Sequence, residues 1–286
     1  MLQISVEKIA GRSLFLLFTA IPLMAGLIYA LLYSFGLTGI LAEGFTLEHW
    51  VGILTDHRFY LSLSFSLYIA VVSVFISSLV SLNLTLKYRQ MWNSKNWEWG
   101  LYIPLAYPAI VAAFIGFQLM SSSGFLSRIA FQLGLIDQPQ EFPGLIQDPW
   151  GIGIITMHTL MAIPFLTLFW LSIFKKDDLE KYGQLSRTLG ATTRQIRNRV
   201  FIPVLLKRGK ALLILYSIFI AGAYEAPLLM GTQRPQMITI YITNKINRFD
   251  LGDRPQAYVA LLIVIMIISI ILLSTVGRSG KTRQLW

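Results

Sequence analysis

The sequence contains no cysteine, and its charged residues are few. The absence of cysteine excludes disulfide bonds, thiolate-ligated metal and thiol catalysis. The three histidines form no cluster at metal-ligand spacing, so no metal site is expected. Charged residues make up 13% of the 286 residues and apolar residues 55%, whereas soluble domains are about 25% charged. A soluble domain of this length could not cover so much apolar surface, and the chain is therefore predicted to lie partly in lipid.

Six stretches are long and apolar enough to cross a bilayer as helices. They cover about residues 13–35, 60–86, 100–120, 152–174, 211–230 and 257–276. The first resembles a signal peptide because it follows Lys8 and Arg12, but its apolar part is too long and no cleavage site is evident, so we expect a retained anchor. The predicted fold class is an all-α membrane protein with one transmembrane domain over residues 1–286.

Lysine and arginine are divided unequally between the two sides of this topology. The termini and the second and fourth loops hold 18 of the 24, and the other side holds six. Because positive residues collect in cytoplasmic loops, both termini are expected in the cytoplasm. The same rule accounts for the net charge of +10, so membrane lipid is an expected partner and nucleic acid is not. On the opposite side, Phe125, Ile129 and Leu133 repeat every four residues up to Gly134, which predicts a short amphipathic surface helix.

The long cytoplasmic loop predicts a helix–glycine–helix elbow over about residues 177–203. Its first helix begins with three acidic residues, carries four apolar residues near one face and stops at Gly190. Thr192 and Gln195 fit a capping box for a second short helix, which Pro203 would end. The acidic residues are Asp177, Asp178 and Glu180, and the apolar ones are Leu179, Tyr182, Leu185 and Leu189. The pattern fits a docking element for a soluble partner and an amphipathic helix on anionic lipid equally well.

This loop also resembles a family motif. Gln184-Leu185-Ser186, Gly190 and Val200-Phe201-Ile202-Pro203 are similar to the EAA motif, E-A-A-x3-G-x9-I-x-L-P, of the membrane subunits of binding-protein-dependent ABC importers. Both spacings agree, whereas Gln184 replaces Glu, Leu185 and Ser186 replace the two Ala, and Ile202 replaces Leu. The resemblance covers roughly residues 60–276. It also includes Gly124–Arg128, Gly222–Pro227 and Asp253–Pro255, which look closest to the polyamine, ferric-iron and phosphonate branch.

The resemblance implies a type I ABC importer permease fold, with six spans and both termini cytoplasmic, in the bacterial plasma (inner) membrane. It also implies that the elbow is a coupling helix seated on an ATPase, with Gln184, Leu185, Ser186, Gly190 and Ala191 as the coupling residues. The implied partners are a dimer of ATP-binding-cassette ATPases, a second permease subunit of the same or another sequence, and an extracytoplasmic substrate-binding protein. No cofactor is expected in this chain, since ATP and Mg would bind the ATPase and the sequence has no GxxxxGK[ST] loop.

Glu225 is a carboxylate inside the predicted fifth span. A charge at the centre of a membrane costs about 2.5–3.5 kcal/mol on insertion scales, so such groups usually face a pore, a partner or a water-filled cavity. With Tyr224, Pro227 and Gln118 it forms a candidate pathway or gate. The alternatives are a carboxylate paired with a basic residue, or one that lies at the interface. His158 is expected to make helix–helix hydrogen bonds, as is Thr159.

The predicted function is a non-catalytic permease subunit that forms half of an alternating-access pathway for a small polar solute. Eight acidic against six basic residues in the extracytoplasmic loops, together with Glu225, favour a polyamine-like cation, and iron or phosphonate stays open. The alternative is an ion-coupled secondary transporter that uses Glu225, although no repeat or second intramembrane carboxylate is present. A membrane-embedded enzyme would need a partner for Glu225, and the sequence shows none.

Overall fold

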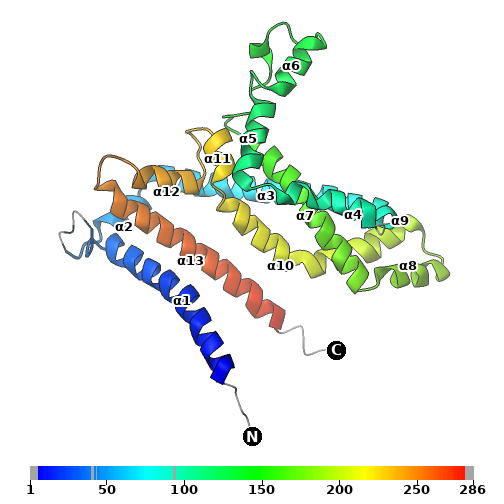
Figure 1. Cartoon of the computed structure of the whole chain (residues 1–286), viewed down its shortest axis with the longest axis horizontal. Helices are drawn as coiled ribbons and strands as arrows, with labels where there is room; N and C mark the ends of the chain where they lie inside the picture. The colour runs from blue at the N-terminus through cyan, green and yellow to red at the C-terminus, as the bar shows by residue number, and fades with distance from the viewer. Residues whose placement is uncertain (1–5, 40–41, 43, 93–94, 281–286) are drawn as a thin grey trace. The chain divides into compact units, whose positions relative to one another are not determined.

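The computed structural model describes residues 6–39, 42, 44–92 and 95–280, and all the regular structure in these ranges is helical (Figure 1). The chain forms two compact units. One unit comprises Met1–Tyr60 together with Tyr241–Trp286, and the other is Leu61–Ile240. An all-helical fold is what the sequence predicts.

The first unit is built on the packing of two long helices. Helix α1 (Val6–Ser34) lies along α13 (Asp253–Gly280), and α13 also contacts α2 (Glu48–Leu54). Three tyrosines join α1 to α13: the ring centroids of Tyr33 and Tyr258 are 4.7 Å apart, and Tyr29 lies 6.0 Å from Tyr258. The rest of α1 exposes large apolar side chains along most of its length, as expected of a helix surrounded by lipid.

The second unit is organised around α7 (Ile152–Lys176), which contacts most of the other helices of the unit. In chain order the other elements are α3 (His57–Trp92), α4 (Lys95–Tyr102), η1 (Pro104–Ala106), α5 (Ala109–Met120), α6 (Phe125–Gln132), η2 (Pro139–Glu141), α8 (Leu179–Thr188), α9 (Thr193–Ile196), η3 (Arg197–Phe201), α10 (Ile202–Ala221), α11 (Glu225–Met230) and α12 (Ile238–Ile246). Helices α3 and α12 continue across the boundary between the two units.

Two apolar clusters form the core of the second unit. One joins α3, α5, α7 and α11 and contains Ile69, Ile154 and Met230. The other joins the ends of α3 and α7 to α8, α9 and α10 and is centred on Trp170, which is fully buried. The indole Nε1 of Trp170 donates a 2.9 Å hydrogen bond to Ser81 Oγ. This bond satisfies both buried polar groups and ties α7 to α3.

Five helical stretches in the described residues are long and apolar enough to span a membrane. They are Ser13–Ser34, His57–Arg89, Ala109–Gln132, Ile152–Lys176 and Asp253–Thr275. The predicted count of six is not reached by this measure, because α10 carries Lys207, Arg208 and Lys210 in its first half.

Two predicted spans differ from the helices observed. The stretch 100–120 is interrupted between α4 and α5, because Pro104 and Pro108 lack the N–H that a continuous helix needs. The stretch 211–230 is also broken: α10 starts earlier and ends at Ala221, and α11 begins a new helix at Glu225. Glu225 therefore lies at a helix break and not within a continuous span.

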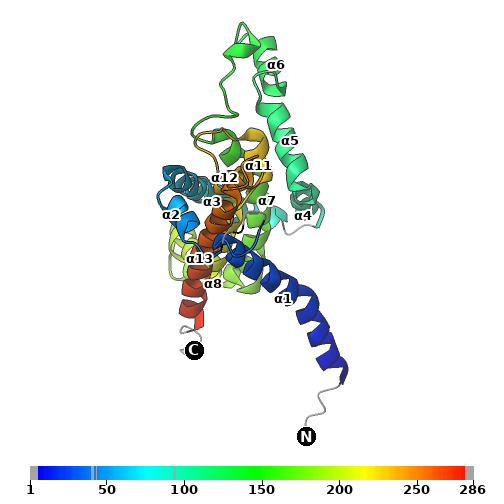
Figure 2. The same cartoon turned by 90° about the vertical axis from the view of Figure 1, so that its left-hand side faces the viewer.

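The predicted surface helix after residue 124 is present as α6. Leu133 is its C-cap, and Gly134 follows in the left-handed conformation with φ of +68°. Phe125 and Leu133 are largely exposed. Within the second unit, α6 and α8 lie at opposite ends in both views (Figures 1 and 2).

Candidate functional site

The elbow consists of α8, a left-handed glycine and α9. Gly190 has φ of +82°, a conformation in which L side chains are strained, and its N–H donates to the carbonyl of Arg187 at 2.9 Å. The capping box is formed: Thr192 Oγ1 accepts from Gln195 N at 3.3 Å, and Thr192 N donates to Gln195 Oε1 at 2.8 Å. The predicted helix–glycine–helix pattern is thus present.

The second arm of the elbow does not end at Pro203. Helix α9 continues through the π-helical turn η3 into α10, and Pro203 lies in the first turn of α10. Pro203 has no N–H to donate to the preceding turn, and the π-helical turn η3 lies directly before it. The elbow is therefore continuous with α10.

Glycine at position 183 allows α8 to approach η3 closely. A Cβ atom at Gly183 would lie 2.8 Å from Cζ of Phe201, which is shorter than real contacts of this kind. Leu179, Ile196 and Phe201 are buried around this crossing. Sequence reasoning missed Gly183, because nothing in its neighbours distinguishes it from a surface glycine.

Arg89 joins the end of α3 to the start of the elbow. Its Nε donates to Glu180 Oε2 at 3.1 Å and its Nη1 to the carbonyl of Leu86 at 2.7 Å. The guanidinium carbon also lies 5.8 Å from the ring centroids of both Phe174 and Phe201, at cation–π distance. The sequence places Glu180 in a helix-start signal, whereas the structure uses it as the partner of Arg89.

The other two acidic residues at the start of the elbow are also paired. Asp177 Oδ2 lies 3.0 Å from Nε of Arg208 on α10, and Asp178 pairs with Lys181 one turn later. This pairing holds the pKa of the Lys181 ammonium above its ordinary value. Asp178 is the residue before α8 and makes no side-chain cap hydrogen bond.

A small pocket of about 60 Å³ lies between α8, α9 and the end of α3. Its lining combines an apolar floor, the Arg89–Glu180 pair and two further arginines. The lining residues are Leu86, Arg89, Glu180, Gly183, Arg187, Thr193, Ile196, Arg197 and Phe201. Basic side chains outnumber acidic ones in this lining, so the pocket is suited to an anionic group.

The predicted coupling residues lie on the exposed side of the elbow. Gln184 is exposed and Leu185 is 60% exposed, while Ser186 and Ala191 are half-buried. Leu189, just before the glycine, is 81% exposed, which is exceptional for a large apolar side chain that ends a helix. The buried face of α8 packs on Leu86 and Phe174, at the ends of α3 and α7. The exposed face consequently points away from the ends of these spans.

The pathway candidates lie around the break between α10 and α11. Glu225 is the first residue of α11 and is half-buried, Tyr224 precedes it, and Pro227 is buried within the helix. Helix α11 packs on α5 and α7, and Gln118 is exposed on α5. The structure thus gathers α5, α7 and α11, but it shows no direct contact between Gln118 and Glu225.

Glu225 has a neighbour that the sequence did not indicate. His158 on α7 is buried and lies within electrostatic reach of the Glu225 carboxylate. The Nε2 atom of His158 has no hydrogen-bond partner among the described residues, and neither has Oγ1 of Thr159. The predicted helix–helix hydrogen bonds are therefore not formed by these two atoms among the described residues, which leaves them available to water, a solute or another subunit.

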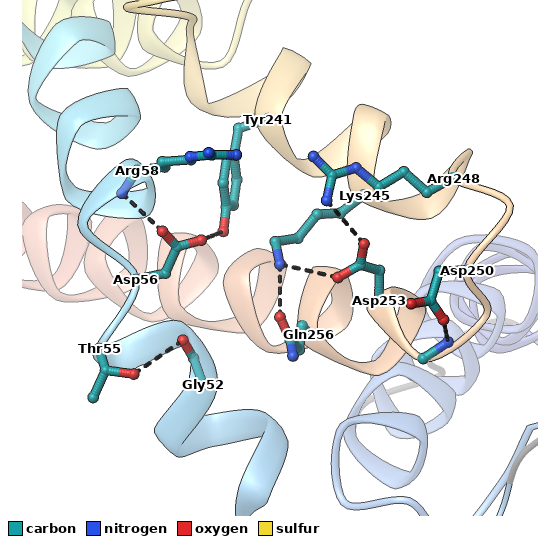
Figure 3. A network of polar contacts seen from close by, with 11 residues as sticks. Gly52, Thr55, Asp56, Arg58, Tyr241, Lys245, Arg248, Asp250, Asp253 and Gln256 are labelled. Atoms are coloured by element: carbon teal, nitrogen blue, oxygen red, sulfur yellow. Dashed lines mark hydrogen bonds and ion pairs between the residues drawn. The ribbon is translucent and has the colours of Figure 1, made fainter.

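A separate polar network lies in the first unit (Figure 3). Lys245 is only 7% exposed; its Nζ lies 2.6 Å from Gln256 Oε1 and 3.4 Å from Asp253 Oδ1. Arg248 Nη1 donates to the other oxygen of Asp253 at 2.9 Å. Sequence reasoning did not single out Lys245, because a lysine in a loop is normally solvated.

The same network joins α12 to the start of α3. Tyr241 Oη donates to Asp56 Oδ2 at 2.7 Å, and Asp56 Oδ1 accepts from the backbone N–H of Arg58 at 2.8 Å. Burial raises the pKa of the Tyr241 phenol above its ordinary value, and the bond to Asp56 adds to the shift. The phenol therefore stays protonated as the donor at neutral pH.

The fold as a whole is that of chains in ABC transporters. A chain of the bacterial alginate ABC transporter, solved with its alginate pentasaccharide-bound periplasmic protein, superimposes with a TM-score of 0.69 at 15% identity, covering 97% of this chain and 94% of that one. A chain of a bacterial ABC transporter involved in importing alginate gives a TM-score of 0.66 at 15% identity, covering 98% and 99%. At this identity the likeness shows the fold alone.

A curated protein adds a match in sequence. The Probable ABC transporter permease protein y4fN of Sinorhizobium fredii (strain NBRC 101917 / NGR234) is 28% identical over 156 residues, half of this chain. The match spans about a quarter (26%) of that protein's length. No protein-family model matches the chain. The chain is thus similar in fold to chains of ABC transporters and in half of its sequence to a probable ABC transporter permease, and neither likeness supports the polyamine, iron and phosphonate branch.

Proposed function

We propose that the chain is a permease subunit of an ATP-driven importer and that its elbow docks on a separate ATPase. Six spans with cytoplasmic termini in the bacterial inner membrane belong to this proposal, with α10 as the additional span. The chain itself would be non-catalytic, and ATP and Mg would bind the ATPase. A second permease subunit and an extracytoplasmic binding protein complete the assembly; the solved alginate transporter was captured with a periplasmic protein of that kind.

The observation that carries the proposal is the exposed face of the elbow. Tyr182, Leu185 and Leu189 are 56%, 60% and 81% exposed, on the side opposite the contact with the span ends. An amphipathic helix on lipid would turn its apolar residues toward the membrane, whereas these point away from the ends of α3 and α7. A docked soluble partner would cover them.

The contacts of the elbow give a route for transmitting movement. Arg89 and Glu180 tie α8 to α3, Asp177 ties the start of the elbow to Arg208 on α10, and α9 runs into α10 without interruption. Closure of the ATPases would thus displace two helices of this unit together. Each ligand can shift the balance between inward-open and outward-open states only by its different affinity for them.

The direct test is co-purification. The tagged chain is expressed with the genes encoded beside it and solubilised in mild detergent, and the proposal expects an ABC ATPase to co-purify. Transport reconstituted in vesicles should require ATP. If the chain purifies alone and moves solute without ATP, the importer proposal is wrong and the elbow is a lipid-surface helix.

The solute is proposed as a small polar molecule, with a polyamine-like cation favoured over iron or phosphonate. Its support is the acidic balance of the extracytoplasmic loops together with Glu225, which lacks an ion-pair partner among the described residues. Titration of the co-encoded binding protein with spermidine, ferric iron and a phosphonate would distinguish the three. If the binding protein bound none of these three ligands, this part of the proposal would be wrong.

A second candidate is an ion-coupled secondary transporter. The buried His158 within electrostatic reach of Glu225 favours it, because such groups can carry a coupling proton. In vesicles without ATP, a pH gradient should then drive uptake, and Glu225→Gln should abolish it. Uptake that requires ATP and does not depend on the pH gradient would exclude this candidate.

A further inference from the structure

The charges of the elbow are paired on one side only. All three of its carboxylates have basic partners within the chain: Asp177 with Arg208, Asp178 with Lys181, and Glu180 with Arg89. In contrast, no carboxylate in the described part of the chain forms an ion pair with the four arginines that follow. These are Arg187, Arg194, Arg197 and Arg199, all exposed. The elbow thus offers a partner positive charge and no free carboxylate.

Two of these arginines line the pocket between α8 and α9. Arg187 comes from α8 and Arg197 from η3, while the charge of Arg89 in the same lining is already matched by Glu180. Arg197 donates its Nε to the amide oxygen of Asn198, a contact that leaves its charge uncompensated. The floor of Leu86, Ile196 and Phe201 is apolar. Such a site suits one anionic group on a short apolar stem.

We propose that this pocket receives an aspartate or glutamate side chain of the partner ATPase, which Arg187 and Arg197 bind. This inference rests on the proposed function. Protein is favoured over lipid phosphate for two reasons: Leu185 and Leu189 expose a second apolar surface on the same helix, and that surface faces away from the span ends. Gln184 is uncharged and supplies no anion, so the carboxylate of the proposed ion pair comes from the ATPase.

The test compares two double variants of equal charge. Arg187→Glu with Arg197→Glu removes both pocket arginines, and Arg194→Glu with Arg199→Glu makes the same change in net charge on α9 and η3, outside the pocket. Each chain is purified in detergent, checked for an unchanged elution profile and thermal midpoint, and titrated with the ABC ATPase encoded beside it. We expect the pocket variant to bind at least about tenfold more weakly than wild type, and the control within about threefold of it.

A charge exchange then identifies the partner group. Carboxylates in the elbow-binding groove of the ATPase are changed to lysine one at a time, and one of them should restore binding to the Arg187→Glu, Arg197→Glu chain. Equal weakening by both double variants would overturn the inference, because it would show a general effect of charge. Unchanged ATPase binding, with loss of co-purified phosphatidylglycerol from the pocket variant, would overturn it in favour of a lipid site. If the wild-type chain binds no ABC ATPase, the proposed function itself fails.

Discussion

The elbow and the polar network of the first unit differ in how far their charged side chains are compensated within the chain. In the network, Lys245 is buried and its charge is met by Asp253 and Gln256, while Asp253 also binds Arg248. Around the elbow, the carboxylates are paired, but Arg187, Arg194, Arg197 and Arg199 form no ion pair with any described residue, and Leu189 is exposed. The first region is complete within this chain, whereas the second has an exposed surface that only another molecule can cover.

This difference predicts different consequences of mutation. Removing one member of a buried ion pair leaves the other charge without compensation, so changes in the network should act on folding. Exposed arginines and leucines contribute little to the stability of the free chain, so changes on the exposed face of the elbow should act on assembly and transport. Each of the following substitutions tests one side of this comparison.

The largest effect is expected from Gly190→Asp. A side chain at this position finds open space, so the cost to folding is limited to about 1 kcal/mol for the left-handed backbone. The same substitution places a carboxylate at the bend of the docking surface, and ATP-dependent transport should be abolished while the protein stays in the membrane. Transport in vesicles, beside the amount of inserted protein, measures this. Full transport by the variant would show that the elbow does not couple to an ATPase.

Lys245→Met tests the polar network of the first unit, whose charges are compensated within this chain. It removes a buried cation, leaving Asp253 with Arg248 alone and Gln256 without its donor, and should destabilise the protein by about 3 kcal/mol. The thermal midpoint in detergent measures the loss. Arg248→Met is the matched control: its side chain is 51% exposed, so its loss should cost under about 1 kcal/mol. Equal effects of the two variants would contradict a special role for the buried lysine.

The Arg89 and Glu180 side chains are 20% and 43% exposed. This pair is therefore intermediate between the buried polar network and the exposed arginines of the elbow. A double-mutant cycle with Arg89→Gln and Glu180→Gln should give a coupling energy of about 1 kcal/mol. We also expect both single variants to lower the transport obtained per ATP hydrolysed while ATPase binding persists, because the link from α8 to α3 is lost. A coupling energy of zero, with normal transport per ATP, would show that the pair contributes neither to stability nor to the transmission of movement.

The local structure of the elbow could be predicted because its signals are local. A glycine stop, a capping box and a short apolar repeat each act within a few residues, and α8, Gly190 and α9 follow them. The start of α6 and its end at Gly134 were predictable for the same reason. The predicted apolar stretches 60–86, 152–174 and 257–276 likewise lie within α3, α7 and α13.

The contacts between distant segments could not be predicted. Nothing in the sequence links Arg89 to Glu180, or His158 to Glu225, because these pairs depend on how the helices pack. Hydropathy also misplaced the start of the helix before Glu225: α10 begins at Ile202, and Lys207, Arg208 and Lys210 interrupt the apolar residues in its first half. The roles of Gln184 and the other coupling residues come from resemblance and stay predictions.

Tyr241→Phe should have a smaller effect than Lys245→Met, because it removes only one hydrogen bond from the network. A bond to a charged acceptor contributes about 1.5 kcal/mol, so the thermal midpoint should fall slightly. Because burial and Asp56 raise the phenol pKa in the folded state, the bond should contribute in full below the unfolded pKa of about 10 and be lost as the pH rises through the higher folded value. The difference between wild type and variant should therefore be constant from about pH 6 to pH 9. A difference that shrinks within this range would show that the phenol ionises there and that Tyr241 is not held as a donor to Asp56.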